Sequence, residues 1–163
     1  VRRGLEAVKT LRTASASATP AIGFGGPPRP ANSELMAAEL EAVLGIKGTA
    51  QEGMFKVVVG RTARAACGCP IGKTMGVNTW AGFAGTAADA VVDGDFAVAE
   101  GELQAVLTSL RGDGINVVAI HHHMTGEAPR ILFLHYWGRG KAVELASAVR
   151  RALDKTDWVA SSK

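Results

Sequence analysis

Apolar positions recur with the helical period in three stretches of the chain. Residues spaced i, i+3, i+4 and i+7 predict one-sided helices over residues 33–44, 100–111 and 141–153. Ser33, or the residue before it, is expected to cap the first helix, and Gly45 is expected to end it in a left-handed conformation.

The remaining apolar positions predict strands. Phe55, Val57 and Val59 alternate with outward-facing positions over residues 55–60, which predicts a strand. Two further β-like runs cover residues 75–83 and 90–98. The last two runs, residues 115–120 and 131–134, flank a short segment with Gly and Pro, which predicts a hairpin with a connection of several residues.

The predicted order of elements is therefore α-β-β-β-α-β-β-α. Strands joined mostly by hairpins, with helices between them, favour an α+β fold in which the helices pack on one face of a largely antiparallel sheet. We expect a single globular domain over residues 34–157, with residues 61–73 irregular. Residues 1–33 are expected to form a flexible basic tail rich in Ala, Ser, Gly and Pro, and residues 158–163 a polar C-terminal tail.

Charge is distributed unevenly along the chain. The net charge is +3, but residues 1–33 carry five basic side chains and one acidic one, so the rest of the chain has a net charge of −1. A nearly neutral domain argues against nucleic-acid binding. No apolar run approaches the roughly 18 residues of a membrane span. Without an apolar signal segment the sequence as it stands predicts a cytoplasmic protein, and an extracytoplasmic one if a signal is missing from the start.

All four histidines lie within residues 114–138, on the predicted hairpin. Because alternate side chains of a strand share a face, His121 and His123 are expected to point the same way. His135 lies on the return strand and faces them in one register but not in a register shifted by one residue. Glu127 lies in the connection between the strands.

Imidazole and carboxylate groups that converge on a stiff frame are the usual ligands of a divalent metal such as zinc. We therefore expect His121, His123, His135 and Glu127 to bind such a metal, with Glu127 or His135 serving in acid–base catalysis on a small molecule. A non-catalytic module for a metal or small ligand, and a metal-free enzyme in which a carboxylate tunes a histidine, remain alternatives. Whether the protein is an enzyme, and whether it forms a homo-oligomer, stays open.

Other polar and aromatic residues are weaker candidates for the same site. His122 alternates to the opposite face and is set aside. Asp95 either orients a histidine ring from behind or belongs to a turn. Trp80 either lines a pocket wall or belongs to the core. Arg130 either binds an anionic substrate or pairs with Glu127.

The two cysteines, Cys67 and Cys69, are separated by one residue. A disulfide between them would close a small, strained ring, and a second pair for a structural zinc site is missing. We interpret them as small residues at a turn, with a role as soft metal ligands as the alternative.

Several motifs resemble a family of bacterial proteins named for the mycobacterial lipoproteins LppY and LpqO. The resemblance covers residues 34–154 and is carried by VVGRT, GCPIG, NTWAGF, GDF, GINVVAIHHHMTGEAPRILFLHYWG and KAVELASAVRRAL. The positions that match the family's H-x-H, E-x-P-R and strand-end histidine pattern are His121, His123, Glu127, Pro129, Arg130 and His135. The resemblance implies a single copy of the domain with the hairpin as its functional centre. It implies no settled activity.

Overall fold

The computed structural model describes residues 4–7, 9–10 and 32–158. Most of the predicted basic tail and nearly all of the predicted C-terminal tail lie outside these residues; of the basic tail only residues 4–7 and 9–10, which are helical, and residues 32–33 are described. Trp158 is the exception in the C-terminal tail, because its ring packs partly buried against the core and lies 4.7 Å from the guanidinium carbon of Arg150.

A six-stranded antiparallel sheet forms the centre of the domain, as the sequence predicted. In spatial order its strands are β1 (Thr49–Gln51), β2 (Met54–Gly60), β5 (Asn78–Gly85), β6 (Ala90–Ala99), β8 (Ile131–Gly140) and β7 (Asn116–His121). The long strands β6 and β8 pair side by side, and β1 and β7 are the edges.

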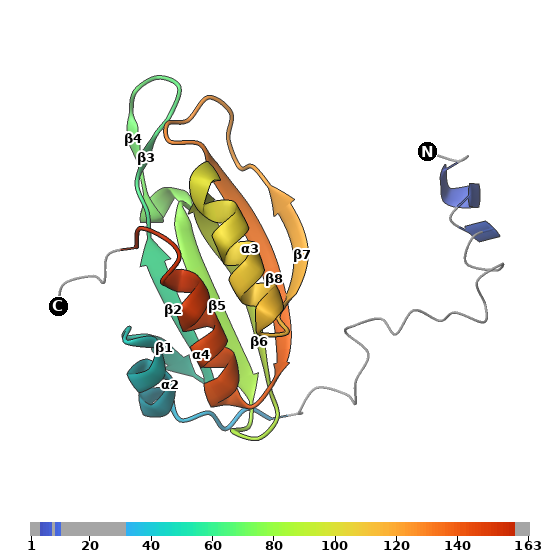
Figure 1. The fold of residues 1–163 in the computed structure, drawn as a ribbon. Coiled ribbons are helices and arrows are strands. Elements are labelled where there is room, and N and C mark those ends of the chain that lie inside the picture. Colours follow the sequence, from blue (N-terminus) through green and yellow to red (C-terminus); the bar gives the residue numbers. More distant parts are fainter. Residues whose placement is uncertain (1–3, 8, 11–31, 159–163) are drawn as a thin grey trace.

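The helices are α2 (Ala37–Leu44), α3 (Leu103–Gly112) and α4 (Ala142–Leu153), with short 3₁₀ turns η1 (Lys73–Met75) and η2 (Glu100–Glu102). In Figure 1 helices α3 and α4 lie across one face of the sheet, and α2 lies beside α4 near β1 and β2. Among the residues described, no helix is both long and apolar enough to cross a membrane.

Strand alternation separates two faces of the sheet. The helix-covered face carries the main core, whose largest fully buried side chains include Tyr136, Phe55, Phe83 and Phe96. The opposite face carries Trp80, Asp95 and His135 at neighbouring register positions of β5, β6 and β8. The predicted arrangement, with helices on one face of the sheet, is confirmed.

The opposite face is covered at one end by a segment that the sequence predicted to be irregular over residues 61–73 and β-like from residue 75. Residues 61–77, here called the arm, form a small hairpin of β3 (Ala63–Arg64) and β4 (Pro70–Ile71) followed by η1. In Figure 1 this hairpin rises at the same end of the molecule as the β7–β8 loop, residues 122–130. The second apolar cluster lies between the arm and the sheet; its members are Ala63, Ile71, Val77, Ala97, Ile131 and Phe133.

The start of the first helix differs from the prediction. Helix α2 begins at Ala37, and the Ser33 hydroxyl accepts a hydrogen bond at 2.9 Å from the Gly85 backbone N–H instead of capping the helix. The expected end is confirmed, since Gly45 has a φ of 67° and its N–H donates to the Glu41 carbonyl. The serine was misread because its partner lies 52 residues away.

Candidate functional site

The register of β7 against β8 decides how the histidines lie. His121 is opposite Phe133, and His135 is opposite Ala119, with a register shift between Val117 and Ala119. His121 and His135 are therefore diagonal neighbours on the same face of the sheet. Their rings stack almost in parallel, with centroids 5.0 Å apart and an interplanar angle of 4°.

His123 lies just beyond β7, where the chain folds back over the sheet. Its ring stacks on Phe133, with centroids 3.5 Å apart. Its Nε2 atom lies 3.1 Å from Nε2 of His121. The structure thus gathers the three imidazoles that the sequence selected, and Phe133 forms an apolar floor under two of them. Phe133 was not singled out from the sequence, although its position two residues before His135 places it on the same face.

Asp95 supplies the carboxylate nearest to these histidines. It lies within β6, directly opposite His135, so the alternative that it belongs to a turn is wrong. Only 4% of its surface is exposed. Its Oδ2 lies 3.7 Å from His135 Nε2, and its Oδ1 is buried without a hydrogen-bond partner among the described residues.

Burial controls the protonation of this group. It raises the pKa of Asp95, and the nearby imidazoles of His135, His121 and His123 oppose the rise by favouring the carboxylate. Burial also lowers the pKa of His123, and repulsion from His121 adds to that effect. A lowered pKa keeps the His123 ring neutral, which is the form that accepts a hydrogen bond or binds a metal.

Glu127, the carboxylate chosen from the sequence, is not brought to the histidine cluster. It lies in the β7–β8 loop, is 8% exposed, and accepts a hydrogen bond at 3.2 Å from the Ile131 backbone N–H. Hydrogen bonds from its own N–H and from that of Ile131, with the nearby His122 and Arg130, hold its pKa below the usual value against the effect of burial. A carboxylate that follows a turn glycine readily bonds its own loop, and that preference prevails here. Arg130 is exposed in the same loop.

Trp80 lies on the same face as Asp95, directly across the β5–β6 pair. Its side chain is half-buried, and the Lys56 ammonium lies 4.5 Å from the centre of its ring. It is therefore not a residue of the helix-covered core, and a place at the wall of a ligand site stays a prediction.

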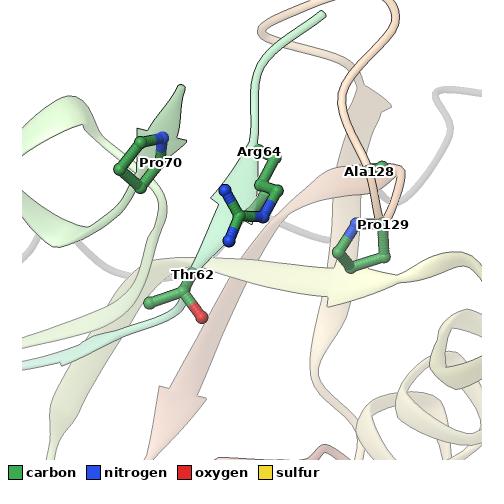
Figure 2. Close-up of a pocket in the computed structure, with 6 residues that line it drawn as sticks. Thr62, Arg64, Pro70, Ala128 and Pro129 are labelled. Carbon is green, nitrogen blue, oxygen red and sulfur yellow. The ribbon is translucent and has the colours of Figure 1, made fainter. Parts of the chain in front are cut away.

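A hollow of about 250 Å³ lies between the arm and the β7–β8 loop, with one side formed by each. Figure 2 shows its lining residues, which are Thr62, Ala63, Arg64, Pro70, Ala128 and Pro129. Reciprocal backbone hydrogen bonds of 2.8 Å between Arg64 and Ala128 join the arm to the loop. None of the histidines lines this hollow, so it neighbours the cluster without containing it.

The geometry of the cluster permits two kinds of chemistry. Within the described part of the chain, no three His, Cys, Asp or Glu side chains already converge as a metal-ligand set. Two imidazole nitrogens that face each other can nevertheless share a proton or bind one cation, and the His135–Asp95 pair can hold and release a proton.

Comparison with known proteins yields a family but no activity. Neither the curated proteins nor the solved structures gave a match. A family model described as a Domain of Unknown Function (DUF1259) matches residues 38–155, which include every strand and helix of the sheet domain except the first residue of α2. The match spans most of the chain in a single copy, and the protein therefore belongs to the DUF1259 family of domains of unknown function.

Proposed function

We propose that His121, His123 and His135, with Asp95 behind them, form a site that binds a divalent metal and serves a metal-dependent reaction on a small molecule. The observation that carries the proposal is the 3.1 Å separation between the Nε2 atoms of His121 and His123. Two nitrogens bound to one tetrahedral zinc at about 2.0–2.1 Å lie roughly 3.3 Å apart. The two rings therefore already have the spacing of a chelating pair.

His135 would be the third ligand, since its ring is stacked on His121. In that role its Nε2, which lies 3.7 Å from Asp95 Oδ2, would keep its contact with Asp95, and its other ring nitrogen would bind the metal. Asp95 would act as a positioning residue, because a carboxylate close to a ligating histidine fixes the orientation of its ring. His123 is exposed, and His121 and His135 are half-buried, which leaves room for water or substrate beside the rings.

A bound divalent metal would supply Lewis acidity and a bound water of lowered pKa. The chain's own contribution is to hold the Nε2 atoms of His121 and His123 3.1 Å apart, to exclude water beneath these rings with Phe133, and to keep a carboxylate at Asp95. Glu127 has no role in this proposal, because its carboxylate is bound to the loop backbone.

Elemental analysis tests the proposal directly. We expect the purified protein, after exposure to zinc and removal of excess metal, to retain about one metal ion per chain. His121→Ala, His123→Ala and His135→Ala should each lose it. His122→Ala is the matched control, since this exposed neighbour lies in the same loop and no ring contact joins it to the cluster. Metal content near zero in the unaltered chain, or equal loss in the control variant, would contradict the proposal.

A second candidate keeps the same residues without a metal. The 3.7 Å approach of Asp95 to His135, with Asp95 buried, favours a histidine that acts as a general acid or base. In this case small-molecule turnover survives chelation and is lost in Asp95→Asn and His135→Ala. Turnover that disappears with a chelator and returns with zinc would reject it.

A narrower family assignment is also proposed. We infer that the chain is an LppY/LpqO-like member of its family, since the histidine hairpin and the E-x-P-R segment match that pattern. Self-association remains a prediction, and sedimentation of the full chain measures it.

A further inference from the structure

The tip of the arm carries two thiols that the proposed function does not use. Cys67 and Cys69 are both exposed, and neither forms a disulfide. They flank Gly68, whose φ of 79° turns the chain sharply. The turn is closed by hydrogen bonds of 2.9 Å from Ala65 N–H to the Cys69 carbonyl and 2.8 Å from Gly68 N–H to the Ala65 carbonyl.

This turn places the two sulfur atoms next to each other in solvent. The side chains of Cys67 and Cys69 interact with each other across Gly68, so the two thiols are close neighbours. No atom lies within 4 Å of the point where a Gly68 Cβ would stand, so the tip is open. The pair is therefore accessible from solvent, and its two thiols lie close enough together to bind one ion.

A positive charge adjoins the pair. The Arg64 guanidinium donates a 3.1 Å hydrogen bond from Nη1 to the Gly68 carbonyl, between the two cysteines. A cation beside cysteines favours the thiolate, which is the form that binds metals. Arg64 is itself fixed, because its backbone pairs with Ala128 in the β7–β8 loop.

We propose that Cys67 and Cys69 form a two-coordinate site for one Cu(I) ion at the tip of the arm. Paired thiolates select soft, monovalent copper, whereas zinc takes four ligands, and this tip offers two. Binding replaces the two thiol protons by one Cu⁺, which leaves a site of charge −1 beside the guanidinium of Arg64. No electron is transferred in the step, and the ion enters as Cu(I).

The site is separate from the histidine cluster in both residues and metal preference. It lies on the arm. The arm approaches the β7–β8 loop at Ala66, because a Cβ added to Gly126 of that loop would stand 3.1 Å from the Ala66 Cβ. Failure of the zinc experiment on the histidines leaves this proposal unaffected, and the converse also holds.

The test is an anaerobic competition of the reduced full chain against a chromophoric Cu(I) chelator. We expect one Cu(I) per chain. Cys67→Ser and Cys69→Ser should each lose affinity by at least about 100-fold, since a lost ligand costs more than the 10–100-fold typical of an outer contact. Arg64→Gln, an outer contact, should cost about 10-fold.

The His121→Ala/His123→Ala double variant is the matched control, and it should bind Cu(I) like the unaltered chain. X-ray absorption of the loaded protein should show two sulfur neighbours. Copper binding that survives both serine substitutions, that depends on the histidines, or that shows nitrogen neighbours would overturn the proposal.

Discussion

Replacing Asp95 by Asn should stabilise the fold while it weakens the site. Asp95 is 4% exposed, its Oδ1 has no hydrogen-bond partner among the described residues, and burial raises its pKa. An unsatisfied buried polar atom costs about 1–3 kcal/mol, and more when it is charged. Asn has the same shape without the charge but keeps two polar atoms, so we expect a gain of about 1–2 kcal/mol at pH 8.

The gain should depend on pH in a defined direction. Because the pKa of Asp95 is higher in the folded than in the unfolded chain, the ionised carboxylate destabilises the fold at high pH. As pH falls through the raised pKa, the folded chain takes up the proton. The advantage of Asn should therefore shrink, and it should vanish below the ordinary value of 3.8.

Urea unfolding of metal-free protein at pH 8 and at pH 3.5 measures both effects. A chelator is needed, because a bound ion would stabilise the unaltered chain by mass action. For a domain of this size, 1–2 kcal/mol corresponds to a rise of roughly 4–8 °C in melting temperature. Asp93→Asn is the matched control, an exposed residue on the same strand face, and it should change stability by less than about 0.5 kcal/mol. An Asp95→Asn protein that is less stable than the unaltered chain at pH 8 would refute the reasoning.

Two further substitutions test the packing around the site. Gly94→Ala should cost more than about 3 kcal/mol in urea unfolding, because a Cβ there would lie 2.2 Å from the Tyr136 hydroxyl, whereas Gly82→Ala, with its nearest atom at 3.6 Å, should cost far less; equal costs would contradict the steric argument. Glu102→Gln should cost about 1–3 kcal/mol, because it removes the charge and replaces one of the two carboxylate oxygens that accept from the Arg61 guanidinium by an amide NH₂, which cannot accept a hydrogen bond. Burial would raise the pKa of Glu102, but its hydrogen bonds, those from Arg61 first, outweigh this and lower it. The cost should therefore begin to shrink as pH falls below 4.5 and vanish only below the lowered pKa of the folded chain; a cost that does not shrink with falling pH would show that charge is not its cause.

The hydrophobic pattern was sufficient to locate most of the helices and strands. Local periodicity reports which face of each segment is buried, so it located α3, α4, β2, β5 and β6 to within a few residues. It missed the hairpin of the arm, because β3 and β4 are two residues long and their apolar side chains are buried by the sheet rather than by each other. It also extended α2 by four residues, since Ser33 bonds a distant strand.

For the proposed site, the sequence by itself selected the histidines that the structure brings together. Four histidines within one hairpin, two of them at alternate positions, selected His121, His123 and His135 without reference to the fold. Alternation along a strand is a local property, but His123 lies just beyond the end of β7, so the loop rather than the strand brings it to His121.

Only the tertiary structure decided which carboxylate joins the histidines. Glu127 is close in sequence, but its side chain satisfies the backbone of its own loop. Asp95 lies 40 residues before His135 and reaches it through the pairing of β6 with β8. Strand order and register are set by burial and hydrogen bonding across the whole sheet, and no local pattern contains them. The histidines of the proposed site were therefore predicted from the sequence, whereas the choice of Asp95 as its carboxylate came only from the fold.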